Sequence, residues 1–313
     1  MTGTVTQQRR SRDDETRHTV SIEVLGPWSL ATSRAFWEGF TPAALQPQTE
    51  REDGSEVGGK GSQLRTVFRA EADWRRAAVE VVQDGGMARL AVSGDGDLEA
   101  AAAQACRFLC LDVDGRGWPD VARRDPVIAA AQAELPGLRP CGFHSPYEAA
   151  AWSVLSQRIR IVQAARLRDR VIARFGEDGA FPAPQVLLSA DPDELDLPGR
   201  KPEYLRAVAE AALEGRLDGA ALRAMEPDMA ARRVQEIKGV GPFGAELVVI
   251  RGANAPDALP RHEARLDAEV AYRYGPSAVL SEVAQAWRPF RTWAAVHLRV
   301  LRERRTHEIG STT

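Results

Sequence analysis

The stretch QEIKGVGPFGAELVVIRG, residues 235–252, contains two glycines that flank one apolar residue and are followed at once by a proline. Glycine commonly ends a helix, and proline is favoured at the first position of the next one. The pattern therefore predicts two helices joined by the tight turn K-G-V-G, residues 238–241. A helical hairpin of this kind sets the fold class of the second half of the chain.

The turn itself has the composition of an anion site. Gly239 and Gly241 permit positive φ angles and close approach of another group to the backbone. Successive N–H groups next to a helix start form a concavity for an anion, and Lys238 adds a cation. Val240 is expected to fill the core of the hairpin. Such a turn suits one phosphate of a nucleic-acid backbone, bound without reading the sequence; the alternative is an ordinary helical hairpin.

Length and composition are those of a globular protein. The chain has 313 residues, 44% of them hydrophobic and 27% charged, which is enough for two domains. It has no run of about 18 apolar residues, so no membrane partner is expected. The first residues have no apolar segment typical of a signal peptide, and a disordered tail is expected over residues 1–17.

The three cysteines, Cys106, Cys110 and Cys141, form an odd set. Without a signal peptide, this favours free thiols in a reducing cytoplasm. Cys106 and Cys110 lie four residues apart on an expected helix, where they are interpreted as packing residues. A metal pair is the alternative, although no fourth ligand is evident. Four cysteines for an iron–sulfur cluster are not available.

The formal net charge is only −3, but basic residues are concentrated in two segments. Residues 156–174 carry six arginines and one aspartate, and residues 287–305 carry six arginines and one glutamate. Two basic helices in a mildly acidic protein suggest one side that faces a polyanion. Solvated helix faces are the alternative.

The first third of the chain has mixed signals. Hydrophobic alternation predicts a strand over 18–26 and three antiparallel strands within 63–96, with turns at residues 84–86 and 94–96. Helical patterns cover 30–40 and 97–109, and a polar, glycine-rich loop is expected over 46–62. Residues 18–115 are therefore predicted to form a small α+β domain with an antiparallel sheet.

The remaining chain is predicted to form an all-α domain over residues 116–306, followed by a tail over 307–313. Ser145, Pro146 and Glu148 have the spacing of a helix start, and Gly176 is expected to cap the next helix. Trp152, Trp287 and Trp293 are assigned to the core. Helices are expected over 145–157, 161–176, 201–215, 228–237, 242–252, 262–275, 276–289 and 290–305, with a short helix within 181–199.

Three segments together resemble a known family. EIKGVGPFGAELVVIRG, DALPRHEARLDAEVAYRYG and WRPFRTWAAVHLRV are similar to the C-terminal half of the helix-hairpin-helix DNA glycosylases, especially the 3-methyladenine DNA glycosylase II branch. SPYEAAAWSVLSQRI and residues 181–215 resemble earlier helices of the same family. The α+β domain resembles its N-terminal domain, so the resemblance covers nearly the whole ordered chain.

The resemblance implies hydrolysis of the N-glycosidic bond to a damaged, alkylated base that is flipped out of duplex DNA, as in base-excision repair. It implies no cofactor and no metal, a double-stranded DNA partner, a monomeric protein, and location in a bacterial cytoplasm on nucleoid DNA. Bifunctional members have a Schiff-base lysine at the position of Phe243, so the resemblance implies hydrolysis without a lyase step. Phe243 matches a pocket position of the family, or it packs in the helix core.

The family places its catalytic aspartate three residues after a proline, which falls on Glu263. A glutamate reaches one C–C bond further, and a misplacement of about 1 Å can cost about 100-fold in rate. The alternative is an acid in a first helical turn, favoured by the helix dipole. Asp267 and Glu269 are assigned to structure or surface, and His262 to a surface or backbone contact.

Four further positions follow from the resemblance. Arg158 falls at the residue that the family wedges into the base stack, or it is a phosphate-facing surface residue; Gln157 before it is expected to hydrogen-bond locally. Leu247 stands where a tyrosine can occur, and Arg299 where the family often has a pocket tryptophan. A cation at residue 299 would repel a positively charged alkylated purine, which an aromatic wall would attract.

Two alternative functions remain. The substitutions at residues 263 and 299 would also suit a catalytically degenerate relative that binds DNA or senses lesions. An ion pair between Glu263 and Arg299 would favour that reading or a changed substrate. A purely structural helical protein is the third possibility, and it would not bind DNA at low salt.

Overall fold

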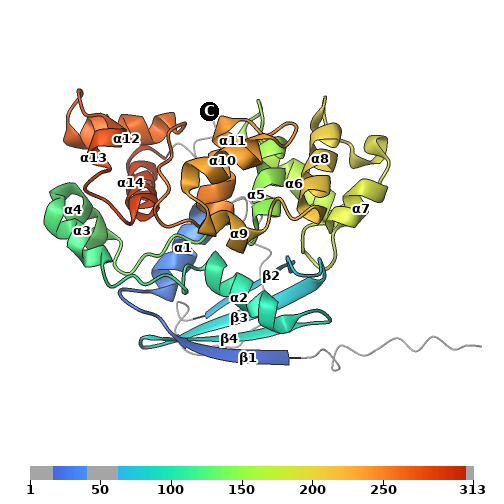
Figure 1. The fold of residues 1–313 in the computed structure, drawn as a ribbon, viewed down its shortest axis with the longest axis horizontal. Coiled ribbons are helices and arrows are strands. Elements are labelled where there is room, and N and C mark those ends of the chain that lie inside the picture. The colour runs from blue at the N-terminus through green and yellow to red at the C-terminus, as the bar shows by residue number, and fades with distance from the viewer. Residues whose placement is uncertain (1–16, 41–62, 308–313) are drawn as a thin grey trace, which may run out of the picture.

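The structure is a computed structural model that describes residues 17–40 and 63–307. The predicted loop over 46–62 and, apart from Arg17 and His307, the predicted tails lie outside the described residues. The sheet forms one end of the molecule, and most helices gather at the other (Figure 1). The predicted α+β fold class is confirmed.

The N-terminal sheet has four antiparallel strands in the order β1-β4-β3-β2. Hydrophobic alternation fixes which face is buried: Ala77, Val79 and Val81 of β3 all point to the core. Strands β3 and β4 join through the two-residue turn Gly85-Gly86, with Asp84 paired to Met87 as the turn signal predicts. The elements of this part are β1 (Arg17–Glu23), α1 (Leu30–Phe40), β2 (Gln63–Arg69), β3 (Arg76–Asp84), β4 (Met87–Gly94) and α2 (Leu98–Phe108).

Helix α2 covers the buried face of the sheet, and its start is fixed by Asp97, whose side chain accepts a hydrogen bond from the backbone N–H of Ala100. Val296, Val300 and Leu301 from the last helix of the chain pack into the same core. The first and last parts of the chain therefore share one hydrophobic cluster.

The rest of the described chain is helical. The elements are α3 (Trp118–Arg124), α4 (Pro126–Glu134), α5 (Pro146–Leu155), α6 (Ile161–Phe175), α7 (Pro184–Ser189), the 3₁₀ turn η3 (Pro192–Leu195), α8 (Lys201–Leu213), α9 (Gly219–Ala224), α10 (Pro227–Gln235), α11 (Pro242–Leu247), the π-helical turn η4 (Val248–Gly252), α12 (Ala264–Tyr274), α13 (Leu280–Val283) and α14 (Arg291–Thr306). Ser145 caps α5 by accepting a hydrogen bond from the N–H of Glu148, as its spacing predicts.

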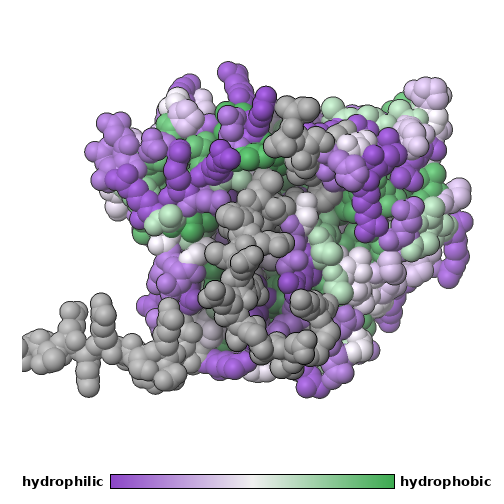
Figure 2. Space-filling model, turned by 180° about the vertical axis from the view of Figure 1, so that it is seen from behind, coloured by the Kyte–Doolittle hydropathy of each residue, from purple (hydrophilic) through white to green (hydrophobic). Residues whose placement is uncertain are grey.

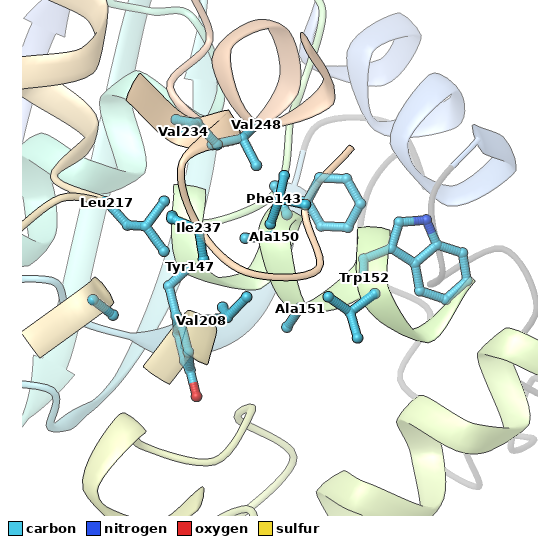
Figure 3. Close-up of a cluster of buried hydrophobic side chains, with 14 of the residues drawn as sticks. Phe143, Tyr147, Ala150, Ala151, Trp152, Val208, Leu217, Val234, Ile237 and Val248 are labelled. Carbon is cyan, nitrogen blue, oxygen red and sulfur yellow. The ribbon is translucent and has the colours of Figure 1, made fainter. Parts of the chain in front are cut away.

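Helix α5 lies at the centre of the helical core, where side chains from the predicted hairpin meet it. Figure 3 shows Val234, Ile237 and Val248 gathered with Tyr147 and Ala150 of α5. A second helical cluster surrounds Trp118, Trp287 and Trp293. The three tryptophans assigned to the core from the sequence (residues 152, 287 and 293) are indeed buried.

Three local predictions differ from the structure. Helices α3 and α4 were not predicted, although Asp125 and Pro126 form a cap and helix start. The helix expected over 276–289 is reduced to α13, because turns after it bring Trp287 into the core, where its indole donates to Asp125 at 2.8 Å. Gly176 ends α6 in an extended conformation rather than a left-handed cap; a Cβ there would lie 2.4 Å from the carbonyl oxygen of Ala180.

The three cysteines are free and buried. Burial raises the pKa of Cys106 and of Cys110 to about 12 and raises that of Cys141 as well. Within residues 17–40 and 63–307, no helix combines the length and the apolar character needed to cross a bilayer.

Candidate active site

The hairpin expected around residues 238–241 is present between α10 and α11. Gly239 has φ +90, and a Cβ there would lie 2.3 Å from the Tyr204 ring, so both its conformation and its neighbour require glycine. Gly241 differs from the expectation, because its φ of −85 suits any residue. A Cβ at Gly241 would meet no protein atom within 4 Å, so the backbone is open to an external group there. Val240 is buried in the core, as expected.

A second turn, between α5 and α6, is fastened to the hairpin. The side-chain amide of Gln157 donates a hydrogen bond of 2.6 Å to the carbonyl oxygen of Gly239. The Nζ atom of buried Lys201 donates to the carbonyl oxygens of Val154, Leu155 and Gln157 at 2.8–2.9 Å. These bonds hold the turn that presents the exposed side chain of Arg158, whose φ of +57 is unusual for a residue other than glycine.

Many arginines of the two basic segments pair with carboxylates of the protein. In the second segment, Arg291 and Arg288 pair with Asp257, while Arg302 and Arg305 pair with buried Glu269. In the first segment, Arg168, Arg170 and Arg174 pair with Glu148, Asp196 and Glu194, respectively. The exposed cations near the hairpin include Arg158, Arg160 and Lys238, the last of which pairs with Glu203. Figure 2 shows hydrophilic residues over much of one face, with hydrophobic patches between them.

A cavity of about 190 Å³ opens beside the hairpin. It brings together Phe243 and Leu247 of α11, Glu263 before α12 and Arg299 of α14. All four residues proposed from the sequence for catalysis and base binding therefore line one space, although they come from three separate segments of the chain. Phe243 is half exposed, so its ring is not held in the helix core.

Glu263 is the N-cap residue of α12. Its Oε1 accepts a hydrogen bond of 3.2 Å from the backbone N–H of Arg265, and its Oε2 lies 3.8 Å from Nε of Arg299. Asp267 is exposed one turn further along the helix, and Glu269 is fully buried among arginines. Of the three carboxylates in this segment, Glu263 is the one that lines the cavity.

A second carboxylate of the cavity, Glu246 of α11, was missed in the sequence. Its Oε2 accepts hydrogen bonds from the backbone N–H groups of Arg261 and His262 at 3.0 and 2.9 Å. Its Oε1 lies 2.8 Å from Nδ1 of His262. Glu246 thus holds the loop that leads to Glu263, and His262 makes a surface contact in that loop. The position of Glu246 one turn after Phe243 is the signal that could have identified it.

Arg251 and Phe36 also line the cavity and were not proposed from the sequence. Arg251 donates to the carbonyl oxygen of Cys141 at 2.8 Å, and its guanidinium lies 4.9 Å from the centre of the Phe36 ring. Burial lowers the pKa of Arg251 to about 10, which leaves the group charged near neutral pH. The described residues contain no group of three or more His, Cys, Asp or Glu side chains placed to hold a metal ion.

The arrangement offers two kinds of electrostatic interaction to a bound molecule. The open backbone at Gly241 can approach an anion, and the carboxylate of Glu263 faces a space large enough for a small organic group. A carboxylate in a largely apolar cavity stabilises a positive charge that develops near it. The site therefore combines an anion contact with a place where a cationic transition state would be favoured.

Comparison with known proteins identifies relatives over most of the chain. No family model matches. A protein of Mycobacterium tuberculosis named "Probable bifunctional transcriptional activator/DNA repair enzyme AlkA" is 28% identical over 213 residues, which are 64% of this chain. The chain spans 42% of the length of that relative. DNA-3-methyladenine glycosylase 2 of Escherichia coli is 28% identical over 71% of this chain and 80% of its own length.

Among solved structures, the 3-methyladenine DNA-glycosylase of Archaeoglobus fulgidus superposes with a TM-score of 0.68 and 20% identity, over 92% of this chain and 99% of the other. At that identity the match supports the fold, including the sheet, and not the activity. The hairpin, the sequence relatives and this structural match together show that the chain is similar to the helix-hairpin-helix DNA glycosylases, and its relatives include 3-methyladenine DNA glycosylases.

Proposed function

We propose that this protein is a monofunctional DNA glycosylase that hydrolyses the N-glycosidic bond of a damaged base, of the alkylated class, in duplex DNA during base-excision repair. The observation that carries the proposal is the position of Glu263, at the wall of a cavity that adjoins the hairpin. The relatives named as glycosylases support the reaction type.

The proposed reaction assigns a task to each part of the site. The turn at Gly239 and Gly241 contacts a phosphate, and Arg158 occupies the space that the flipped nucleotide leaves. The damaged base enters the cavity beside Phe243, while Glu263 faces the deoxyribose. At about 4 Å and an effective dielectric constant of about 20, a carboxylate stabilises a positive sugar by at most about 4 kcal/mol, or about three powers of ten in rate.

Hydrolysis without a lyase step is consistent with the lysines that the structure describes. Lys201 is buried and bonded to three backbone carbonyls, and Lys238 pairs with Glu203 on the surface. Neither lines the cavity. A Schiff base to the sugar needs a lysine within reach of the reacting carbon, and Phe243 occupies the position where bifunctional relatives carry one.

The test is release of free base from alkylated duplex DNA by the purified protein, compared with the Glu263→Gln variant. The wild type is expected to release base, and the variant to bind the same DNA without releasing it. Asp267→Asn is the matched control, since Asp267 is an exposed acid of the same helix, and it is expected to keep full activity. Equal base release by wild type and Glu263→Gln would overturn the role of Glu263.

A second function, DNA binding without turnover, is favoured by one observation. The ion pair between Glu263 and Arg299 occupies the carboxylate that catalysis needs. A degenerate relative of this kind would bind duplex DNA with the salt dependence typical of phosphate contacts and release no base from any lesion. The same assay therefore separates the two functions.

A further inference from the structure

The cavity has an unusual balance of charge for a site that receives a positively charged base. Three arginines line it: Arg251 of η4, Arg265 of α12 and Arg299 of α14. The two carboxylates in its wall are engaged by donors of the protein: Glu246 by the backbone of the loop before α12, and Glu263 by the N–H of Arg265 and by Arg299. The negative charge is thus already compensated on the protein side.

The aromatic residues of the cavity wall also attract a cation only weakly. The described lining residues include two phenylalanines, Phe36 and Phe243, and neither tryptophan nor tyrosine. The Phe36 ring already has the guanidinium of Arg251 over it at 4.9 Å. Cation–π attraction is strongest with tryptophan, so this wall offers little to a second cation.

We infer that, within the proposed glycosylase function, the cavity prefers an uncharged damaged base with a carbonyl acceptor over a cationic N-alkylpurine. The inference rests on the proposed function and specifies its substrate class. A guanidinium has only N–H donors and no acceptor. Arg299 therefore fits a carbonyl oxygen or ring nitrogen, whereas it repels a base that is already positive.

The charge of the leaving group points in the same direction. In the reaction, the C1′–N bond breaks and its electron pair stays on the base, while the oxygen of water bonds to C1′. The water proton passes through the Glu263 carboxylate to solvent. A cationic base leaves as a neutral molecule, but an uncharged base leaves as an anion that must take a proton from solvent. A guanidinium beside that base stabilises the developing anion, which gives Arg299 a direct role only with uncharged bases.

The test uses two duplexes of identical sequence, one with hypoxanthine and one with 7-methylguanine, under single-turnover conditions. Each excision rate is divided by the spontaneous rate of base loss in the same duplex, because a cationic base leaves more readily without any enzyme. The wild type is expected to accelerate loss of hypoxanthine at least about tenfold more than loss of 7-methylguanine. Arg299→Gln is expected to shift this ratio at least about tenfold toward 7-methylguanine.

Two further variants make the outcome specific. Arg299→Lys keeps the charge and is expected to keep the wild-type preference, while Arg304→Gln changes an exposed arginine of the same helix and should leave both rates unchanged. The inference is overturned if the wild type favours 7-methylguanine, or if the ratio of the two normalised excision rates is the same in Arg299→Gln as in the wild type. The glycosylase function stands in either case. Release of neither base, nor of any other damaged base, overturns the proposed function as well.

Discussion

Nε of Arg299 lies 3.8 Å from Oε2 of Glu263, so an arginine of the last helix and the carboxylate at the start of α12 face each other across one wall of the cavity. The pair is only partly exposed, with 12% and 25% of the two side chains accessible. The arginine competes with any positive charge that develops on a substrate beside the carboxylate.

The role of Glu263 can be tested by binding instead of turnover. A duplex that carries a protonated pyrrolidine in place of one deoxyribose mimics a cationic sugar, and tetrahydrofuran is its uncharged counterpart. We expect the wild type to prefer the pyrrolidine duplex, and Glu263→Gln to lose at least about tenfold of that preference, because the carboxylate attracts the cation. Competition binding at fixed salt measures the ratio of the two affinities.

Arg299→Gln is expected to change the ratio of the two duplex affinities in the direction opposite to Glu263→Gln. With the competing cation gone, preference for the pyrrolidine duplex is expected to increase above that of the wild type. If Glu263→Gln and wild type show the same ratio, the carboxylate does not face the sugar.

The two hairpin glycines are expected to respond differently to the same substitution. Gly239→Ala places a side chain at φ +90 and against the Tyr204 ring, so it should lower the free energy of unfolding by about 1–2 kcal/mol or more. Gly241→Ala meets no protein atom within 4 Å, and stability should change by less than about 0.5 kcal/mol. Urea unfolding measures both.

Measurements of DNA affinity distinguish a structural role of a hairpin glycine from a direct contact with DNA. Gly241→Ala is expected to weaken binding of undamaged duplex by about tenfold, or about 1.4 kcal/mol, because the added methyl group keeps a phosphate from the backbone. A stable Gly241→Ala variant with wild-type affinity would show that the turn does not contact DNA.

The hairpin could be predicted from the sequence because its signal is local, whereas Glu263 was indicated by its position in the family resemblance. Glycine and proline mark the turn, and an acid at a helix start is a cap as well as a candidate for catalysis. Gly241 shows the limit of this reasoning: the residue type suggested a positive φ, whereas the structure has an extended conformation and open space. Neither the φ angle nor a neighbouring atom of the described residues requires glycine at this position.

Contacts between distant elements could not be predicted in the same way. The six arginines of residues 287–305 suggested a polyanion-binding face, but four of them pair with Asp257 or Glu269, which come from other elements. Glu246 accepts hydrogen bonds from the loop before α12, and Arg251 contacts Cys141 and Phe36, which are more than 100 residues away in the chain. No periodic pattern in one segment carries that information.

Lys201 is expected to stabilise the turn that presents Arg158. Burial lowers the pKa of Lys201, yet its Nζ has three backbone carbonyls as acceptors. Lys201→Met removes the donor from buried carbonyls and should lower the free energy of unfolding by about 1–3 kcal/mol. Lys238→Met is the matched control for stability, since Lys238 is exposed, with an expected change below about 0.5 kcal/mol. Equal unfolding midpoints for the two variants would contradict the assigned role of Lys201.

The buried cysteines should resist modification in the folded protein. Their thiols have raised pKa values because they are buried, and the thiolate is the reactive form. At a pH of about 8, we expect a thiol-specific reagent to label the native protein much more slowly than the protein in denaturant, where all three cysteines react. Rapid labelling of one residue in the native state would locate an opening of the core around it.

His297 should make the protein less stable in mild acid. It is fully buried in α14, its Nδ1 donates to the carbonyl oxygen of Trp293 at 2.8 Å, and burial lowers its pKa to about 4. An unfolded histidine has a pKa of about 6.5. As the pH falls from about 6.5 to about 4, the unfolded chain takes up a proton that the folded protein does not, so the free energy of unfolding falls by an amount on the order of 3 kcal/mol.

His297→Asn keeps an N–H donor near the carbonyl of Trp293 and removes the titrating group. The variant is expected to lose stability by a similar amount at every pH, because the smaller side chain leaves a gap in the core, and to lack the fall between pH values of about 7 and about 4.5. Urea unfolding at the two pH values gives the difference, and the same substitution at partly exposed His18 is the matched control. If wild type and His297→Asn lose equal stability over this range, His297 titrates alike in the folded and unfolded chains, and the acid sensitivity comes from other groups.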